Sequence, residues 1–478
     1  MHDGVCREGN LEARQANELS YPVAAQRDPD YLFLEMGLSR HAIPQGCFRH
    51  IARARALIAV ALAAFPLAAQ QTAALAEEPA VSAQARSLYE RTRDSVAQIR
   101  VLLGASDSHA ATGTGFAVGK GLFLTNYHVV ADKALEPETY RLEFVLPSGR
   151  RGPLEIVAVD VIHDLAVVRG DSGGARALAL RDLPLAKGEK GFSLGYPLSQ
   201  GLTVVEGTYN GRSEEQYYER IHFTGAINAG MSGGPAVDAG GRVFGVNVAT
   251  HRRGQLVSFL VPSKFARRLL GRAARAGGAD FREDVGAQLS AHQAEIMGAL
   301  LKAKPPVQTL GEFSVPAKLG EFMQCGAGTQ RDADQLYAVD SHYCYTYSSL
   351  YIDRRLHTGM VSFRHSILRD RKLGALRFAH LQEARFGAGQ FGEAFDRKHH
   401  TAWNCEDEIV ALQGARAKMA LCVRRYKRFD GLYDVMLRMA TLGDPAIALQ
   451  SSLDMEGVSY EAAREFAKRY LEAIRWNR

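Results

Sequence analysis

The sequence predicts a mainly β region, built as a barrel or a sandwich, followed by a smaller α+β unit at the C-terminus. Short apolar or alternating runs separated by glycine-rich turns fill Val96–Pro262. Helical periodicity takes over after Ser263, and four cysteines gather in the last third of the chain. Evenly spaced short strands with little helical pattern are typical of all-β barrels and sandwiches.

Composition and charge indicate a globular protein with more than one domain. The chain has 478 residues, 46% hydrophobic and 23% charged, with a net charge of +6. Wholesale disorder is excluded, and the length favours two or three domains. Basic and acidic residues are interspersed, so we expect no nucleic-acid partner. The densest basic run, Arg416–Arg428, is predicted to be a solvated strand or hairpin face. No apolar run reaches the ~18–20 residues of a membrane-spanning helix.

Residues 1–76 are predicted to be a leader. An apolar run over 56–69 follows several arginines and precedes Ala74-Leu75-Ala76, the pattern of a secretory signal peptide and its cleavage site. A buried core helix is the alternative. Because a signal begins near the start of translation, Met36 is the expected initiator and Glu77 the first mature residue. The mature chain is expected in the periplasm or outside the cell, with no stable membrane span.

Cysteine usage agrees with export. Cys6 and Cys47 would be lost with the leader. The remaining cysteines are Cys325, Cys344, Cys405 and Cys422. An even number in an exported segment favours disulfides. Three pairings are possible, and pairing each cysteine with its sequence neighbour is preferred because it closes two short loops of similar size. Metal sites need closely spaced ligand pairs, which are lacking, so no metal and no cofactor are predicted.

Each element is expected from a local pattern. Gly170–Gly191 lacks periodicity and would link two halves of the β region. Amphipathic helices are predicted over Ser263–Ala276 and Phe281–Lys304, and Ser459 is the expected N-cap of a last helix. The expected strands include Ser95–Leu103, Gly121–Thr125, Arg141–Leu146, Leu154–Val159, Leu165–Val168, Leu202–Thr208 and Arg242–Ala249. The expected divisions of the chain are a leader (1–76), a β domain (77–278), a helical linker (279–306) and a cysteine-containing α+β domain of unknown role (307–478).

Three groups of residues carry side chains suited to acyl transfer. They lie in Thr112–Phe116 with Leu124–Val130, in His163–Val168, and in Ala226–Pro235. Taken singly, each has a plain structural explanation. Together they supply a base, an orienting carboxylate and a nucleophile in the order His128, Asp164, Ser232. Hydrolysis of a peptide bond through an acyl-enzyme needs that set of groups.

The role of each group follows from its chemistry. A serine hydroxyl needs a base within hydrogen-bond reach, and His128 is the predicted base for Ser232. A carboxylate must hold the other ring nitrogen of the histidine, which suits Asp164. Glycines around Ser232 allow the backbone N–H groups of Gly230 and Ser232 to converge on a developing oxyanion.

These residues carry a resemblance to a known family. The segments TGTGFAVGKGLFLTNYHVV, HDLAVV, AINAGMSGGPAV and FGVNVAT resemble trypsin-like (chymotrypsin-fold) serine endopeptidases, in particular the bacterial HtrA/Deg type. The resemblance covers roughly Ser95–Leu270. It implies two six-stranded β-barrels with the active site between them, a triad of His128, Asp164 and Ser232, and oxyanion amides at Gly230 and Ser232.

The sequence also departs from this family. Met231 stands where relatives usually have Asn or Asp, and no PDZ domain is recognised after residue 270. We therefore expect an exported serine endopeptidase acting on proteins or peptides. The alternative is a catalytically weak or inactive protease-like binding protein of the cell envelope. An oligomer is compatible with either.

Substrate preference is read from the residues that match the family's specificity pocket. Ala226 replaces the acidic residue of relatives that cut after Lys or Arg, and Asn247-Val248-Ala249 matches the pocket wall. Ala249 in place of glycine should shorten the pocket, which predicts small aliphatic P1 residues. The remaining histidines of interest are His222, His251, His399 and His400. They are expected to lie at the surface or to be satisfied locally, because metal-ligand spacing is lacking.

Overall fold

The structure is a computed structural model that describes residues 83–477, except 105, 107, 120, 214–216, 251–255, 276–279, 332–334, 347–348 and 389–395. The predicted leader, with its apolar run 56–69 and cysteines Cys6 and Cys47, lies outside the described residues, as does His251. Val81–Arg478 form a single compact unit.

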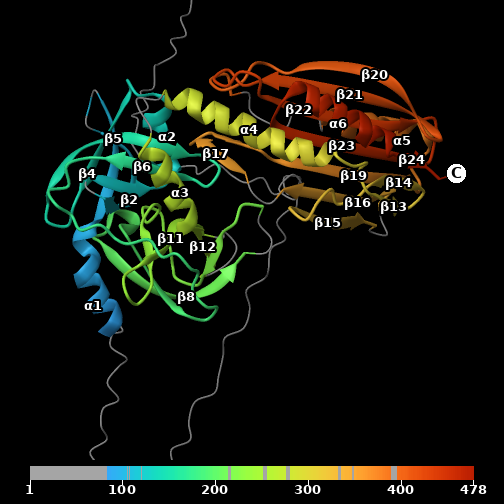
Figure 1. Ribbon diagram of the computed structural model, residues 1–478. Coiled ribbons are helices and arrows are strands. Elements are labelled where there is room, and N and C mark those ends of the chain that lie inside the picture. Colours follow the sequence, from blue (N-terminus) through green and yellow to red (C-terminus); the bar gives the residue numbers. More distant parts are fainter. Residues whose placement is uncertain are drawn as a thin grey trace, which may run out of the picture. The chain divides into compact units, whose positions relative to one another are not determined.

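Two closed six-stranded antiparallel barrels occupy the first half of this unit, which confirms the predicted fold (Figure 1). The first barrel has the order β1-β2-β3-β6-β5-β4, and the second has the order β10-β11-β12-β9-β8-β7. The strands of the first are β1 (Val96–Leu103), β2 (His109–Gly119), β3 (Leu122–Thr125), β4 (Tyr140–Val145), β5 (Arg151–Asp160) and β6 (Leu165–Arg169). Those of the second are β7 (Lys190–Gly195), β8 (Thr203–Arg212), β9 (Ile221–Phe223), β10 (Pro235–Val237), β11 (Val243–Thr250) and β12 (Ser258–Pro262).

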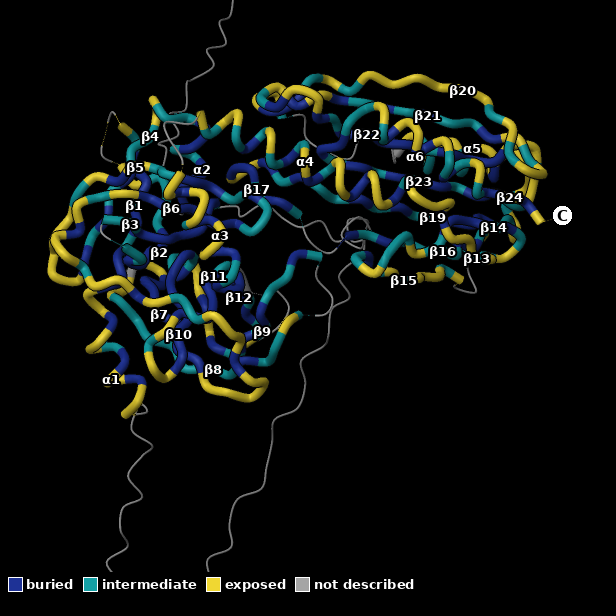
Figure 2. The backbone as a smooth tube through the Cα atoms, in the orientation of Figure 1, coloured by how far each residue is buried: buried dark blue, intermediate teal, exposed yellow. Residues whose placement is uncertain are grey.

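Hydrophobic patterning explains why these segments close into barrels. In β1 the apolar residues Val96, Ile99 and Val101 are buried, while intervening polar residues are partly exposed. The run Leu165–Val168 of β6 is buried at every position, as expected for a strand covered on both faces. Figure 2 shows the buried positions concentrated inside the barrels. The segment Gly170–Gly191 was predicted to link two halves. Residues 170–189 connect the barrels without a regular strand or helix, and β7 begins at Lys190.

Among the described residues between Ala83 and Ala273, three α-helices pack around the barrels. They are α1 (Ala83–Thr92), α2 (Tyr127–Leu135) and α3 (Ser263–Ala273). The predicted helix after Ser263 therefore forms but ends at Ala273 rather than Ala276. On α3, Phe265 and Leu269 are buried in the same apolar cluster as Val261 of β12.

The C-terminal domain is built on a seven-stranded antiparallel sheet in the order β15-β16-β19-β23-β22-β21-β20. Its strands are β15 (Met323–Gln330), β16 (Tyr337–Thr346), β19 (Val361–Asp370), β20 (Asn404–Leu412), β21 (Ala415–Arg425), β22 (Tyr433–Leu442) and β23 (Ile447–Val458). Disulfides Cys325–Cys344 and Cys405–Cys422 join the outer two strands at each edge, in the preferred pairing. Each disulfide therefore ties an edge strand to its inner neighbour.

Smaller elements complete this domain. The helices are α5 (Ala375–Ala388) and α6 (Tyr460–Glu472), and Ser459 caps α6 by accepting from Ala462 N, as predicted. A three-stranded sheet contains β13 (Val307–Leu310), β14 (Phe313–Pro316) and β24 (Arg475–Trp476). A separate hairpin contains β17 (Leu350–Asp353) and β18 (Leu356–Thr358).

The long helix α4 (Phe281–Leu301) packs on both the first barrel and the C-terminal domain. Val285 and Leu289, near its start, belong to the apolar core that contains Phe123 of the barrel. Ile296 and Met297, farther along, belong to the core under the seven-stranded sheet. The segment expected as a linker is thus a packed helix: residues near its start are buried against the first barrel, and residues farther along are buried against the C-terminal domain.

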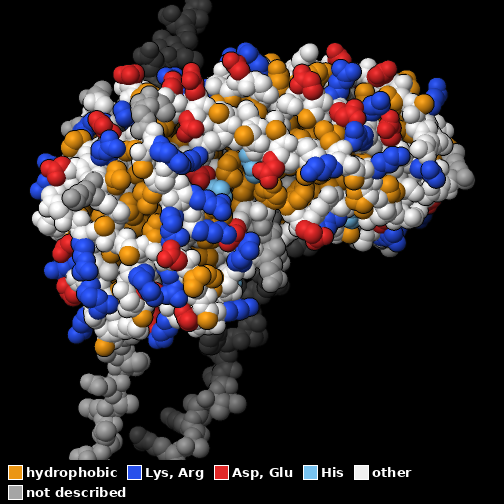
Figure 3. All heavy atoms as spheres, in the orientation of Figure 1, with side chains coloured by type: hydrophobic (Ala, Val, Ile, Leu, Met, Phe, Trp, Pro, Cys, Tyr) orange, Lys and Arg blue, Asp and Glu red, His pale blue; other side chains and the backbone are white. Residues whose placement is uncertain are grey.

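Charged side chains of both signs are interspersed over the face shown in Figure 3. The expectation of a solvated face for Arg416–Arg428 is wrong at Arg424, which is buried on β21 and bonded to Asp434 of β22. None of the helices in the described part of the chain is long and apolar enough to cross a membrane.

Candidate active site

His128 is placed by the start of helix α2, directly after strand β3. Asn126 is the N-cap residue, with extended backbone, but its side chain does not cap the helix. Instead its Nδ2 donates to the backbone oxygen of Asp164 at 2.7 Å. Because Asn126 is fully buried, this bond holds the turn before β6 against the first turn of α2. The local fold thus brings Asp164 beside His128.

Asp164 binds His128 at two points. Its Oδ1 accepts from the backbone N–H of His128 at 2.8 Å, and its Oδ2 lies 2.6 Å from the ring Nδ1. The backbone of Asp164 has φ of +59°, a left-handed conformation that aspartate tolerates better than most residues. Two contacts from one carboxylate fix the position of the His128 backbone and keep the Nδ1 edge of the imidazole turned toward Asp164.

The electrostatics of the pair favour a protonated ring. Burial lowers the pKa of His128, but attraction to the Asp164 carboxylate and the hydrogen bond between them outweigh burial and raise the pKa above 6.5. The imidazole remains a quarter exposed. It can therefore exchange protons with a group bound at the surface while its other edge stays bonded to Asp164.

Ser232 lies in a tight turn between β9 and β10 that two glycines make possible. Gly230 and Gly233 have φ of +92° and +84°. A Cβ on Gly230 would lie 2.3 Å from Tyr196 O, and one on Gly233 would lie 2.2 Å from Thr114 O. Both positions therefore require glycine for conformation and for space.

The turn carrying Ser232 abuts the segment carrying His128. Ser232 O accepts from Thr114 N of β2 at 2.8 Å, and Thr114 Oγ1 donates to Gly230 O at 2.6 Å. A Cβ on Gly233 would also lie 2.9 Å from Asn126 N, two residues before His128. In this structure no hydrogen bond joins Ser232 Oγ to His128 Nε2, although both residues are described.

The backbone around Ser232 presents two donors. No hydrogen-bond acceptor within the described residues is found for the N–H of Gly230 or for that of Ser232. The neighbouring N–H groups are used: Met231 N donates to Asn228 O, and Gly233 N donates to Asn247 O. The turn therefore leaves available the same two N–H groups that the sequence singled out.

Met231, the departure noted in the sequence, is a core residue of the second barrel. Its side chain is fully buried in an apolar cluster with Phe223, Phe244 and Leu260. A Cβ on Gly195 would lie 2.8 Å from Met231 Cα, so β7 approaches the turn closely. Apolar packing anchors the turn next to Ser232, and no buried charge is needed there.

The residues expected to bind substrate have different environments. Ala226 is exposed, Val248 is half-buried in β11, and the side chain of Ala249 lies outside the described residues. Asn247 is fully buried: its Oδ1 accepts from Ser193 Oγ, and its Nδ2 donates to Leu194 O and Met231 O. Its side chain therefore supports the Ser232 turn from inside the barrel.

Among the described residues, one cluster of possible metal ligands is compact enough to hold an ion: Cys325, His342 and Cys344. Both sulfurs are joined in a disulfide, so they cannot act as thiolate ligands. His399 and His400 are buried, and His399 is satisfied locally as expected. His399 is bonded to carboxylates on both sides, and His222 is partly buried.

Sequence reasoning missed Tyr351, a residue of the C-terminal domain that packs on His128. The ring centroids lie 5.7 Å apart with an interplanar angle of 63°. The alternating pattern Leu350-Tyr351-Ile352 signals a strand, but nothing in it identifies the partner of the Tyr351 side chain.

Part of the chain is similar in sequence to known peptidases. Residues 113–246 match the family model described as trypsin-like peptidase domain. The chain is 31% identical over 178 residues to a probable periplasmic serine endoprotease, DegP-like, of Chlamydia pneumoniae, covering 35% of each protein. It is 30% identical over 204 residues to the mitochondrial serine protease HTRA2 of Bos taurus, covering 39% of this chain and 42% of that protein. The chain thus spans less than half the length of these relatives.

Solved structures match a similar share of this chain. The crystal structure of Deg5 is 29% identical, with 39% of this chain and 91% of that chain covered and a TM-score of 0.34. The serine endoprotease of Yersinia pestis is 22% identical, with 40% and 66% covered and a TM-score of 0.35.

Proposed function

Residues 113–246 are a trypsin-like peptidase domain related to the HtrA/DegP-type serine proteases, and from this premise we propose that the chain is a serine endopeptidase. Ser232 Oγ attacks the carbonyl carbon of a peptide bond while His128 Nε2 takes its proton. His128 then donates that proton to the leaving amine, and an acyl-enzyme remains on Ser232. Water, activated by the same imidazole, releases the acid and restores the serine. The reaction needs no metal or cofactor.

The observation that carries this proposal is the two-point bond between Asp164 and His128, held against the turn of Ser232. With Nδ1–H bonded to Asp164, the neutral ring keeps its lone pair on Nε2, the tautomer a general base requires. The paired carboxylate also stabilises the imidazolium that forms when the proton arrives. The hydrogen bond from Thr114 N to Ser232 O, and the lack of room for a Cβ on Gly233 beside Asn126 N, support a close approach of Ser232 to this ring.

Oxyanion stabilisation is assigned to the two backbone donors beside Ser232. The N–H groups of Gly230 and Ser232 have no acceptor among the described residues, so a substrate carbonyl oxygen can take both. Losing one such donor typically costs about 3–4 kcal/mol of transition-state stabilisation. Met231 lies between these donors, and its burial in the barrel core keeps its side chain out of their path.

A fluorophosphonate probe tests the proposal directly. An activated Ser232 displaces fluoride from phosphorus and becomes covalently labelled, while His128 accepts the hydroxyl proton. Purified mature protein, Glu77 to Arg478, should be labelled, and Ser232→Ala should not. Ser148→Ala is the matched control, because Ser148 is an exposed turn serine whose hydroxyl accepts from Arg150 N, and it should label like the wild type. Absence of labelling in folded wild-type protein would favour the inactive binding protein.

Substrate preference belongs to the same proposal. We expect cleavage after small aliphatic P1 residues such as Val or Ala, because Ala226 supplies no negative charge and Ala249 replaces glycine at the pocket wall. Profiling with a peptide library measures this preference. A profile dominated by Arg, Phe or Glu at P1 would contradict it.

Export is the remaining element of the proposal. The apolar run 56–69 with its cleavage motif supports it, as do the two disulfides, which persist in oxidising compartments. One similar protein is described as probably periplasmic and another as mitochondrial. Protein produced from its own leader and recovered from the periplasm should begin at Glu77.

A further inference from the structure

A hairpin of the C-terminal domain, β17–β18, is docked on the helix that carries His128. It forms its own two-stranded sheet. Leu350, Ile352 and Leu356 lie in one apolar cluster with Tyr127 and other residues of α2. Tyr127, fully buried, donates its hydroxyl to Ile352 O at 3.1 Å. The hairpin is therefore part of the packing that fixes α2.

A surface ion pair strengthens the same contact. Arg354 Nη2, in the turn of the hairpin, lies 2.5 Å from Asp132 Oδ2 on α2. Asp132 is mostly buried and Arg354 is partly exposed, so the pair marks the rim of the interface. Apolar core, backbone hydrogen bond and ion pair together leave the hairpin little freedom relative to α2.

Tyr351 is only partly buried and lies at the edge of this core. Its ring centroid is 6.5 Å from that of Tyr127, and the ring also lies beside His128. Both neighbours of Tyr351 in β17 are buried. The ring of Tyr351 lies edge-on to that of His128, with 5.7 Å between the ring centroids, and its centroid is 5.2 Å from that of His357 on β18. His357, on the paired strand of the same hairpin, thus contacts the ring of Tyr351 as well.

The hairpin is also anchored from beneath by buried polar groups. Asp353 Oδ2 lies 2.6 Å from His399 Nε2, and His399 Nδ1 lies 2.6 Å from Asp396. Burial lowers the pKa of His399, but the two carboxylates outweigh it and raise the pKa, which favours a charged ring between them. These bonds tie β17 to the segment before β20.

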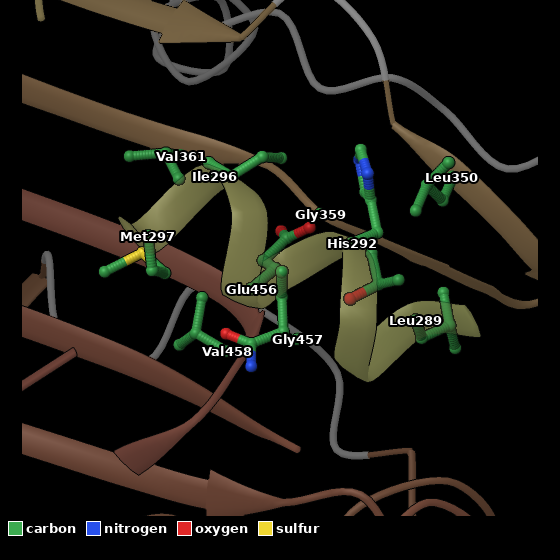
Figure 4. A pocket seen from close by; sticks show the side chains of 12 residues that line it. Leu289, His292, Ile296, Met297, Leu350, Gly359, Val361, Glu456, Gly457 and Val458 are labelled. Atoms are coloured by element: carbon green, nitrogen blue, oxygen red, sulfur yellow. The ribbon is translucent and has the colours of Figure 1, made fainter. Parts of the chain in front are cut away.

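At its two ends the hairpin packs against helix α4. A cavity of about 20 Å³, large enough for roughly one water molecule, separates Leu350 and Gly359 from Leu289 and His292 of α4. Figure 4 shows these side chains around it. Leu350 also lies in one apolar cluster with Leu289 of α4 and Tyr127 of α2, so a movement of the hairpin away from either helix would break this packing.

We propose that the C-terminal domain supplies a positioning residue for the peptidase site: the ring of Tyr351 holds the imidazole of His128 in the orientation that serves Ser232. This inference rests on the proposed serine endopeptidase function. Asp164 fixes one edge of the imidazole, but a quarter of the side chain is exposed and the ring can still tilt. Tyr351 restricts that tilt from the neighbouring side. A displacement of a catalytic group by about 1 Å can reduce rate ~100-fold.

The test measures kcat and KM separately for Tyr351 variants of the full mature chain. Tyr351→Ala should lower kcat roughly 10- to 100-fold with KM nearly unchanged, because the base is misplaced while the substrate pocket is intact. Tyr351→Phe should restore most of the activity, because the ring and not the hydroxyl makes the contact. Tyr343→Ala is the matched control: Tyr343 lies on β16, and its loss should leave kcat unchanged.

Thermal unfolding of each variant checks that the fold survives. Tyr351→Leu, which keeps an apolar side chain in place of the ring, replaces the alanine variant if the latter does not fold, with the same expected fall in kcat. An unchanged kcat, a rise in KM alone, or a rise in activity would overturn the positioning role. Fluorophosphonate labelling separates the two proposals: wild-type protein that does not label refutes the peptidase function, whereas equal labelling rates for wild type and Tyr351→Ala refute only the inference.

Discussion

Replacing Asp164 by asparagine is expected to lower kcat/KM roughly 10⁴-fold, the loss that follows when a triad carboxylate becomes an amide. Asp164 accepts two hydrogen bonds from His128, one from the backbone N–H and one from ring Nδ1–H. An asparagine has a single acceptor oxygen. If that oxygen serves the backbone, its NH₂ group faces Nδ1 and selects the tautomer protonated at Nε2. That tautomer cannot take the proton of Ser232.

The pH profile gives a second measurement on the same variant. The carboxylate raises the pKa of His128 above 6.5, and the base works in its neutral form. Wild-type kcat/KM should therefore fall as the pH is lowered through an apparent pKa above 6.5. In Asp164→Asn the raising interactions are lost and burial remains, so the residual activity should extend to lower pH.

Asp160→Asn is the matched control for this experiment. Asp160 forms a similar carboxylate–histidine pair, with His163 Nδ1 at 2.9 Å, on the other side of the same turn. His163 stacks on Phe265 at 3.8 Å and not on the catalytic residues. Asp160→Asn should change kcat/KM little. Near wild-type activity in Asp164→Asn, or equal losses in both variants, would show that the His128–Asp164 pair has no special part in catalysis.

The sequence predicts the strands of the barrels better than it predicts the C-terminal domain, for a physical reason. Alternation of apolar and polar residues predicts the barrel strands, as do continuous apolar runs such as Leu165–Val168, which is buried throughout. His128, Asp164 and Ser232 lie in short segments whose residue types have few other joint explanations. Each of these patterns is local in sequence, so it can be recognised without knowing which strands pair.

Contacts between distant segments could not be predicted in this way. Tyr351 meets His128 across more than 200 positions of sequence, and its apolar neighbours Leu350 and Ile352 join the core of α2. Arg424 lies in a basic run that suggests solvation, yet β21–β22 pairing places it opposite Asp434. Strand register places Arg424 opposite Asp434, and packing of the hairpin on α2 places Tyr351 beside His128. Both depend on tertiary contacts as well as on local propensity.

That pairing leads to the largest stability effect expected in the molecule: Asp434→Ala should lower the free energy of unfolding by about 3–5 kcal/mol. Asp434 is 4% exposed, and it accepts from Arg424 Nε at 2.8 Å, Tyr426 Oη at 2.7 Å and Gly457 N at 3.1 Å. Alanine leaves the buried Arg424 guanidinium without its carboxylate and removes the acceptor for the other two donors. The total free energy of unfolding of a typical domain is only about 5–15 kcal/mol.

Chemical denaturation of the disulfide-intact protein measures this loss, and Glu465→Ala provides the scale. Glu465 pairs with Arg469 on α6 at 2.8 Å, but both side chains are substantially exposed, so its removal should cost less than about 0.5 kcal/mol. Equal losses for the two variants would contradict the role assigned to the buried carboxylate. Because Tyr426 also bonds Thr358 at the end of β18, the Asp434 variant should loosen the hairpin that presents Tyr351. Below its unfolding transition it should therefore label with fluorophosphonate more slowly than Glu465→Ala, which connects the stability of the C-terminal sheet to the geometry of His128.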